Sequence, residues 1–326
     1  MWECCTRYVS SIDGVNGQKA TFCFLLSPHV FSLLEDQVTP SSLSSPCCFC
    51  LFVLSTPFHM SASLPGAEGK LNEQIRERIA FLSRELALPH LADGFPHLRE
   101  WRPRVPQAVS EETIAAHVDH TLLKSTATAA AVTRLCEEAR TYQFCTVCVH
   151  DCFVPLCRAL LEGSAVRVAC VCNFPLGHSS PRVKAMEAAE NIANGAQEID
   201  TVMNVGLLRD RQYRKAYDDF FHIAQVCRER GVTLKIILET CLLSTEEIID
   251  ACIIGVANRV DFVKTSTGFS TAGATPEAVD VMLAVVGDAC AVKVSGGVRD
   301  RPTALQYLRA GAQRIGTSSG TQICPL

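Results

Sequence analysis

Two lysines in strand-like apolar runs are the residues of this chain best suited to covalent chemistry. Lys264 lies in Asp261-Phe-Val-Lys-Thr-Ser-Thr-Gly268, and Lys293 lies in Ala291-Val-Lys-Val-Ser-Gly-Gly297. Burying an ammonium group is costly unless a partner compensates it. Two buried lysines that converge each disfavour the charge on the other, so one of them is pushed towards the neutral amine. A neutral lysine amine attacks carbonyl carbons and forms Schiff bases.

The required shift in the lysine pKa is within reach of a protein interior. An unperturbed lysine has a pKa of ~10.4, and lowering it to about 7 takes roughly 4–5 kcal/mol of differential interaction. A neighbouring ammonium group and partial desolvation can supply this together. The pair therefore predicts an amine nucleophile rather than two structural cations.

Four strand-like segments each carry a charged residue on the face opposite their apolar residues, because side chains alternate along a strand. The charged residues are Asp200, Lys235, Lys264 and Lys293. Any one of them alone would be interpreted as a strand end with its head group in solvent. Three cations and an anion on the same face of four strands instead predict that they converge inside a barrel, where the aspartate limits the net charge and can move protons.

Strand-like and helical patterns alternate through residues 110–326, which indicates a parallel sheet. The strand-like segments are centred near Val118, Val147, Val168, Thr201, Ile236, Val263, Lys293 and Ile315. The helical patterns cover Ala127–Arg140, Phe153–Glu162, Ser180–Asn194, Tyr213–Arg230, Thr245–Ala257, Pro276–Val286 and Pro302–Ala310. Eight such units predict an α/β fold of the (β/α)8 TIM-barrel type. The alternative is a doubly wound sheet, but no Gly-rich dinucleotide fingerprint follows the first strand.

The part of the chain before the barrel divides in two. Residues 1–59 mix Cys, Ser, Phe and Pro without a sustained period, so we expect this atypical extension to be disordered or an artefact of the gene model, with Met60 as the start. Acidic residues there, such as Glu3 and Asp13, are wrong for a transit peptide. Residues 60–109 predict an amphipathic helix followed by a loop, and Ser110 predicts a helix N-cap.

The end of the chain departs from a complete barrel. The sequence stops at Leu326, a few residues after the eighth strand, so we expect the eighth barrel helix to be missing or a stub. Its loss should expose apolar surface on the first and eighth strands.

Two loops rich in Gly and Ser follow the seventh and eighth strands. They are Ser295-Gly-Gly-Val-Arg299 and Gly316-Thr-Ser-Ser-Gly320. Barrel enzymes often bind phosphate with the loops at these two places, and glycines there expose backbone N–H groups that form an anion cradle. The alternative is that they are simple turns, which also favour glycine.

Composition limits the classes of partner and compartment. The 326 residues have a net charge of −4 with interspersed signs and no basic block, which disfavours nucleic acid or an anionic membrane as partner. No apolar run approaches the roughly 18 residues that a membrane span needs. Many of the 18 cysteines lie within apolar patterns, so we expect reduced thiols inside a cell. Cys145-Thr-Val-Cys148 reads as a strand with buried cysteines rather than as a redox or zinc motif.

These motifs together resemble deoxyribose-phosphate aldolase, a class I aldolase family, in its compact bacterial-type form. The resemblance runs from about residue 110 to 322. The motifs are His117-Val-Asp-His-Thr-Leu-Leu-Lys124, Phe174-Pro-Leu-Gly177, Glu198-Ile-Asp200, Leu234-Lys-Ile-Ile-Leu-Glu-Thr240, Phe262-Val-Lys-Thr-Ser-Thr-Gly268, Val292-Lys-Val-Ser-Gly-Gly297 and Arg314-Ile-Gly-Thr-Ser-Ser319.

The resemblance implies a role for each matching residue. Lys264 matches the imine-forming lysine, Lys293 the lysine that lowers its pKa, and Asp200 the acid of the proton relay. Asp119 and Lys235 match polar residues that line the site. Cys148 matches a cysteine at the edge of the pocket, where we expect packing. The positions that match phosphate-binding residues are Gly268, Gly296, Gly297, Ser318 and Ser319.

The implied activity is that of an aldehyde-lyase in deoxyribose phosphate catabolism: reversible cleavage of 2-deoxy-D-ribose 5-phosphate to D-glyceraldehyde 3-phosphate and acetaldehyde. The lysine replaces a metal, so we expect no metal and no cofactor. The resemblance further implies a cytoplasmic enzyme with a small phosphosugar as partner and leaves a homodimer open. The alternatives are another phosphate-binding Schiff-base aldolase, a truncated barrel without activity, and a membrane- or redox-linked protein built on the cysteine-rich N-terminus.

Overall fold

The computed structural model describes residues 7–13, 19–25, 65–98 and 108–324. The chain divides into two compact units, Met1–Ser63 and Leu64–Leu326. In the first unit, β1 (Arg7–Asp13) and β2 (Lys19–Leu25) form an antiparallel pair, which the sequence analysis did not predict. β2 has the β-branched and aromatic residues that strands favour, but the run is too short to stand out from its surroundings. The remainder of residues 1–59, and Met60, lie outside the described residues.

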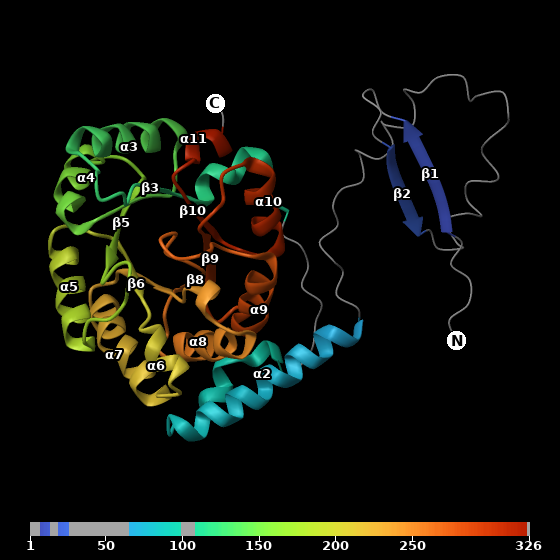
Figure 1. Cartoon of the computed structure of the whole chain (residues 1–326). Helices are drawn as coiled ribbons and strands as arrows, with labels where there is room; N and C mark the ends of the chain where they lie inside the picture. Colours follow the sequence, from blue (N-terminus) through green and yellow to red (C-terminus); the bar gives the residue numbers. More distant parts are fainter. Residues whose placement is uncertain (1–6, 14–18, 26–64, 99–107, 325–326) are drawn as a thin grey trace. The chain divides into compact units, whose positions relative to one another are not determined.

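The second unit contains a closed barrel of eight parallel strands, as the sequence predicted (Figure 1). The strands are β3 (Val118–Thr121), β4 (Thr146–Val149), β5 (Arg167–Cys172), β6 (Glu198–Val202), β7 (Thr233–Ile237), β8 (Phe262–Lys264), β9 (Ala291–Ser295) and β10 (Arg314–Thr317). The first and last of these pair directly, since Ile315 lies opposite Val118. Closure therefore brings residues from both ends of the unit into one interior.

Helices surround the barrel, as Figure 1 shows in a view along its axis. They are α3 (Ala129–Tyr142), α4 (Val154–Leu160), α5 (Pro181–Ala193), α6 (Val205–Arg209), α7 (Tyr213–Glu229), α8 (Thr245–Ala257), α9 (Pro276–Val286) and α10 (Arg301–Ala310). All seven predicted helical segments are confirmed. Their starts are set by local chemistry: α8, for example, begins with a capping box in which Ser244 and Glu247 exchange side-chain and backbone hydrogen bonds.

One predicted cap has a different geometry. Ser110 precedes a 3-10 helix, Glu111–His117, rather than an α-helix, and its side chain makes no cap hydrogen bond to the backbone. The acidic first turn, Glu111 and Glu112, is present as expected. Because the helix is 3-10, its hydrogen bonds join residues three apart, and the Thr113 N–H is bonded to the Ser110 carbonyl instead.

The short helix α11 (Gly320–Ile323) follows β10, and the expected exposure of the first and last barrel strands is wrong. The outward-facing Val118 of β3 and Ile315 of β10 are fully buried. Ile323 of α11 is also fully buried, and Ile114 of the 3-10 helix belongs to the same hydrophobic core. A short helix and a 3-10 segment before β3 therefore contribute to the core on the side that a full helix would cover.

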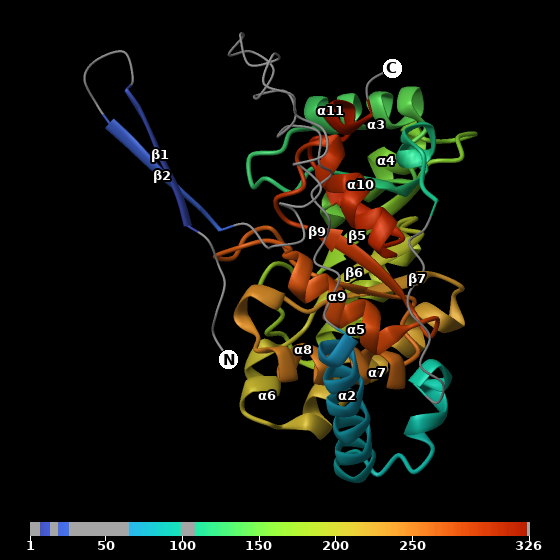
Figure 2. The same ribbon diagram turned by 90° about the vertical axis from the view of Figure 1, so that its right-hand side faces the viewer.

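The helix α2 (Pro65–Glu85) lies across the outside of the barrel (Figure 2), in contact with α7, α8 and α9. Its apolar face is buried through Ile75, Ile79 and Leu82, as the helical spacing predicted. The Arg78 guanidinium donates two hydrogen bonds to Asp250 of α8, each 2.7 Å long. α2 is thus fastened to the barrel by both apolar packing and a bidentate ion pair.

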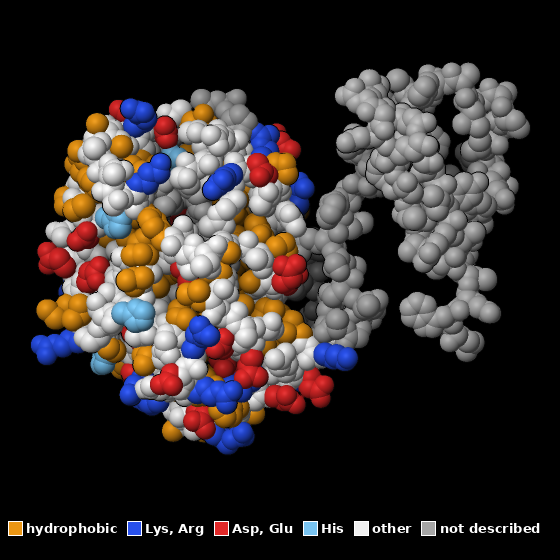
Figure 3. Space-filling view, in the orientation of Figure 1, with side chains coloured by type: hydrophobic (Ala, Val, Ile, Leu, Met, Phe, Trp, Pro, Cys, Tyr) orange, Lys and Arg blue, Asp and Glu red, His pale blue; other side chains and the backbone are white. Residues whose placement is uncertain are grey.

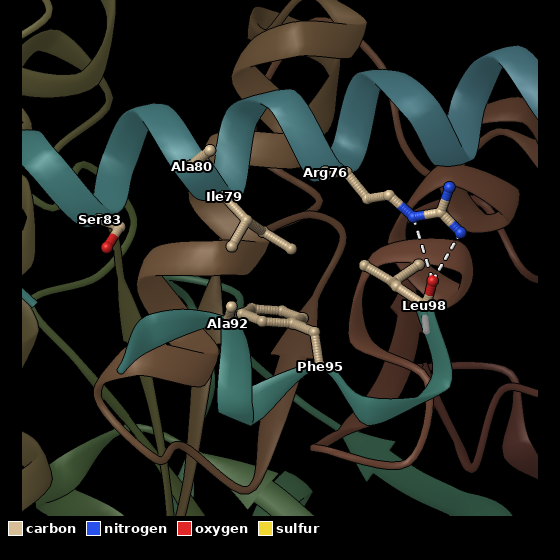
Figure 4. Close-up of a pocket in the computed structure, with 7 residues that line it drawn as sticks. All are labelled: Arg76, Ile79, Ala80, Ser83, Ala92, Phe95 and Leu98. Carbon is tan, nitrogen blue, oxygen red and sulfur yellow. Dashed lines mark hydrogen bonds between the residues drawn. The ribbon is translucent and has the colours of Figure 1, made fainter. Parts of the chain in front are cut away.

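A cavity of about 540 Å³ lies between α2 and two 3-10 turns, Leu91–Gly94 and Pro96–Leu98 (Figure 4). It is lined by Arg76, Ile79, Ala80, Ser83, Ala92, Phe95 and Leu98. The Arg76 guanidinium is already engaged, because Nε and Nη2 both donate to the Leu98 carbonyl at 3.0 and 2.6 Å. This cavity is therefore a gap beneath α2, and the Arg76 guanidinium that lines it is already hydrogen-bonded to the protein.

Within the described residues, no helix combines the length and the apolar character that crossing a membrane requires. On the face of the barrel unit seen in Figure 3, basic and acidic side chains are interspersed. This agrees with the mixed charge pattern of the sequence.

If the Arg78–Asp250 ion pair fastens α2 to the barrel, breaking it should cost more stability than breaking an exposed ion pair. Asp250→Asn should lower the free energy of unfolding by about 3 kcal/mol, since it removes the buried carboxylate from the largely buried Arg78 and leaves only the exposed Glu246 at 3.4 Å. Asp218→Asn breaks the exposed Arg214–Asp218 pair and should cost less than about 1 kcal/mol. Urea titration followed by circular dichroism measures both, and equal losses would contradict the proposed fastening.

Candidate active site

Three lysine ammonium groups converge on one carboxylate inside the barrel. Asp200 of β6 accepts from Lys235 of β7 at 2.7 Å through Oδ1, and from Lys264 of β8 at 2.9 Å and Lys293 of β9 at 2.7 Å through Oδ2. The convergence predicted from strand alternation is confirmed. Consecutive parallel strands place these residues side by side, as the pairings of Asp200 with Lys235 and of Lys264 with Lys293 show.

Two further carboxylates and a guanidinium complete the set of charges. Lys293 Nζ lies 2.5 Å from Asp119 of β3, which in turn lies 2.5 Å from Arg314 of β10. Arg314 reaches Glu198 of β6 at 3.3 Å, and Glu198 lies 2.5 Å from Lys235 Nζ. The ion pairs therefore form a closed ring of alternating sign, and we call these six residues the lumen ring: Asp200, Lys293, Asp119, Arg314, Glu198 and Lys235.

Lys264 stands apart from the other two lysines in its charge environment. Lys293 contacts two carboxylates and Lys235 contacts three, of which Asp119 is the most distant at 4.0 Å. Burial alone would lower the pKa of both lysines, but these carboxylates raise it. Lys264 shares a single carboxylate oxygen with Lys293. Burial lowers the pKa of Lys264, Asp200 opposes this, and the Lys293 ammonium lowers it further, so that the net direction is downward.

Lys264 is also the least enclosed of these three buried lysines. Its side chain is 4 % exposed, whereas those of Lys235 and Lys293 are 0 % exposed. Burial alone would raise the pKa of Asp200, but the three lysines hold it well below the ordinary value for a carboxyl group. The arrangement supplies an amine of lowered basicity beside an ionised carboxylate, which is what imine formation and proton transfer require.

The opposite wall of the lumen is apolar. Leu123, Cys148, Ala169 and Val171 form a small buried cluster against Phe174. Burial raises the pKa of the Cys148 thiol. Of the Cys145-Thr-Val-Cys148 motif, Cys148 is a buried strand cysteine as predicted, but Cys145 lies just before β4, is only partly buried and has its sulfur 3.7 Å from Arg167.

The loops after β8, β9 and β10 carry the predicted phosphate-binding residues. Gly268, Gly296 and Gly297 all have positive φ, at +84°, +83° and +87°, and Gly268 and Gly297 are exposed. Ser318 is exposed, and Ser319 is partly buried. The Ser319 N–H already donates to the Thr317 hydroxyl at 2.9 Å, which leaves the Ser319 hydroxyl as its available donor.

Glycine at 296 is needed because two loops cross there. The Gly296 carbonyl accepts from the Ala274 N–H at 3.1 Å, so the loop after β8 lies directly on the loop after β9. A Cβ on Gly296 would lie 2.8 Å from the Gly273 Cα, and a Cβ on Gly273 would overlap the Gly296 backbone. Gly273 was not predicted from the sequence, because a lone glycine in a loop carries no signal of a crossing.

Glu239, at the end of β7, also holds the loop that follows Lys264. It has the left-handed conformation (φ 58°, ψ 60°), and its buried carboxylate accepts from the Thr267 hydroxyl at 2.5 Å and from the Thr267 N–H at 3.3 Å. A non-glycine residue in this region is strained and persists where the surroundings require it. Glu239 thereby fixes the position of Thr267, just before Gly268.

The end of β6 is fixed by a buried ion pair behind the strand. Lys184 of α5 donates to the Val202 carbonyl at 2.7 Å and to Asp219 of α7 at 2.6 Å. Asp219 also accepts from the Asn204 N–H at 3.1 Å. These contacts tie the strand that carries Asp200 to the two helices outside it.

Sequence reasoning did not assign Glu198 and Arg314 to the site, although a signal was present. Glu198 is two residues before Asp200, and Arg314 is two residues before Gly316, so alternation places each on the inward face. Gly316 itself makes room for the site, because a Cβ there would meet the Lys293 side chain at 3.0 Å.

Residues 113–325 match the model of the DeoC/LacD family aldolases. The chain belongs to this family. It is 46% identical over 217 residues to a deoxyribose-phosphate aldolase of Carboxydothermus hydrogenoformans, covering 66% of this chain and 95% of that one. It is 44% identical to a deoxyribose-phosphate aldolase of Thermotoga maritima, covering 69% and 89%. The solved tetrameric deoxyribose phosphate aldolase of Aeropyrum pernix superposes with a TM-score of 0.62 at 31% identity, covering 66% and 91%.

Two neighbouring glycines of this aldolase predict a matched pair of variants. Gly297→Ala should cost only the strain of an alanine at positive φ, about 1 kcal/mol, because nothing lies within 4 Å of the added Cβ. Gly296→Ala bears a similar strain and also a clash with the Gly273 backbone, so it should cost at least about 2 kcal/mol more. Chemical denaturation of both variants measures the difference, and equal stabilities would refute the loop crossing.

Proposed function

We propose that this chain is a class I aldolase that reversibly cleaves 2-deoxy-D-ribose 5-phosphate into D-glyceraldehyde 3-phosphate and acetaldehyde. The observation that carries the proposal is Lys264, a buried amine of lowered pKa that lies 2.9 Å from an ionised carboxylate in a closed barrel. Its motifs and its similarity to the aldolases described above support the same reaction.

Lys264 is the nucleophile in this proposal. Its neutral amine adds to the C1 aldehyde of the open-chain sugar, and loss of water gives a protonated imine. The C3 hydroxyl then loses its proton, the C2–C3 bond breaks, and the electron pair moves through C2 towards the imine nitrogen. This releases glyceraldehyde 3-phosphate and leaves an enamine. Protonation at C2 followed by hydrolysis frees acetaldehyde and restores the amine.

Asp200 and Lys293 act on that nitrogen and its protons. Asp200 lies 2.9 Å from Lys264 Nζ, which supports a role as the acid–base group of the relay, with a water as the carrier to C2. Lys293 shares the same carboxylate oxygen and keeps Lys264 deprotonated by repulsion.

Asp119 and Lys235, predicted to line the site, are fully buried members of the lumen ring. Their burial supports a role through Lys293 and Asp200 rather than a primary contact with the sugar. We assign the substrate phosphate to the loops after β8, β9 and β10, where Gly268, Gly297 and Ser318 are exposed. Gly296 and Ser319 belong to the same cradle, and the backbone N–H groups and hydroxyls there suit an anion.

The proposed setting follows from the substrate and the thiols. We propose that the enzyme works in the cytoplasm, where a reducing environment would keep cysteines such as those from Cys136 to Cys324 as thiols. We propose a small phosphosugar as partner, with no nucleic acid or membrane, and a homodimer as the assembly to test by light scattering.

Borohydride trapping tests the chemistry directly. The purified chain is incubated with deoxyribose 5-phosphate or acetaldehyde, reduced, and mapped by mass spectrometry. A stable adduct should form on Lys264. Lys264→Arg should lose the adduct and lower kcat by at least about 10³-fold, since it removes the nucleophile. A folded chain that gives no adduct would instead be a barrel without this activity.

Replacing Lys293, the second lysine, tests the proposal because the direction of the resulting change in the Lys264 pKa is predicted. Lys293→Met removes the repelling charge, so the pKa of Lys264 should rise and the pH midpoint of trapping should move upward. Lys124→Met changes a lysine outside the lumen ring and should leave the midpoint where it is in the wild-type chain. An unmoved midpoint in a folded Lys293→Met variant would remove Lys293 from the proposed role.

A further inference from the structure

The lumen ring contains three anions and three cations, so its net charge is zero without any contribution from Lys264. Its anions are Asp119, Glu198 and Asp200, and its cations are Lys235, Lys293 and Arg314, all of them buried. Lys264 is not a member of the ring and contacts it through one hydrogen bond, from its Nζ to Asp200. A proton on Lys264 would therefore be an unmatched charge in a buried space, which is unfavourable at low local dielectric.

Two members of the ring take no part in the proposed chemistry. Arg314 contacts Asp119 at 2.5 Å and Glu198 at 3.3 Å. Its guanidinium lies 5.4 Å from the centre of the Phe262 ring, which also limits its movement. Glu198 in turn forms an ion pair with Lys235 at 2.5 Å. These two residues close the ring on the side away from Lys264.

Resting on the proposed function, we propose that Arg314 and Glu198 are positioning residues that close the lumen ring and set the charge balance that keeps the Lys264 amine unprotonated. They act through Asp119, Lys293, Lys235 and Asp200. Arg167 also contacts Glu198, at 2.6 Å, but its side chain is 40 % exposed, so solvent screens its charge and it does not count among the buried set.

The groups that face Lys264 make the direction of each effect clear. They are Asp200 from β6, Lys293 from β9 and the Cys148 thiol from β4, which burial keeps protonated. Removing the Arg314 charge leaves the lumen net negative and favours a proton on Lys264. Removing the Glu198 charge leaves it net positive and disfavours that proton. The two changes should thus act in opposite directions on the same amine.

The experiment is the pH dependence of imine trapping with acetaldehyde, measured as the initial rate of adduct formation on Lys264 under cyanoborohydride. The midpoint should move up by about one pH unit in Arg314→Gln and down by about one in Glu198→Gln, the order expected for one unit charge beyond contact at an effective dielectric constant near 20. The double variant Glu198→Gln/Arg314→Gln should return close to the wild-type midpoint.

Two controls separate charge balance from structural damage. Arg314→Lys keeps the charge and should keep the midpoint, even if its stability falls. Asp250→Asn breaks a buried ion pair outside the barrel interior and should lower stability without moving the midpoint. Circular dichroism establishes that each variant is folded.

Several outcomes would overturn the proposal. Slower trapping with an unmoved midpoint in folded Arg314→Gln and Glu198→Gln would give both residues a purely structural role. Shifts in the same direction, or a moved midpoint in Arg314→Lys, would also reject charge balance. A double variant whose midpoint stays as far from the wild-type value as that of a single variant would reject it as well. A wild-type chain without any adduct on Lys264 would instead refute the proposed function itself, so the two failures are distinguishable.

Discussion

The Asp200 carboxylate is the contact on which the rest of the site depends. It binds three ammonium groups at 2.7–2.9 Å with no exposure to solvent. Each ion alone would be expensive to bury, and the cost is offset because every charge of the ring meets opposite charges on two sides. Lys264 alone has a single, shared partner, and this inequality singles it out as the reactive amine. The Lys264 amine is reactive because it has too little opposite charge around it to hold its proton firmly.

The barrel is the scaffold that makes such a set possible. Parallel strands end at one rim, so side chains from six strands, β3 and β6 to β10, can meet without any long loop. The outer elements serve the same end: Lys184 and Asp219 fix the end of β6, and Glu239 fixes the loop after β8. The remaining wall, from β4 and β5, stays apolar, which keeps the local dielectric low and leaves one side free for a substrate.

Much of this could be predicted from the sequence, and the reasons for the limits are physical. Alternation along strands was enough to place Asp200, Lys235, Lys264 and Lys293 together, and helical spacing located the helices within a few residues. Alternation also places Glu198 and Arg314 on the inward faces of their strands. Their pairing could not be predicted, because an ion pair between strands far apart in sequence leaves no local pattern. The Gly273–Gly296 crossing and the burial of Val118 and Ile315 depend on how elements pack, which no single segment encodes.

Closure of the barrel also determines when the site can exist. The Asp119–Arg314 ion pair joins residues 195 positions apart, one in the first barrel strand and one in the last. During synthesis from the N-terminus, Asp119 emerges long before its partner, and the ring lacks a cation until β10 has been made. Until then Asp119 and Glu198 can pair within the ring only with Lys293 and Lys235, so the interior keeps one unmatched negative charge that the last strand neutralises.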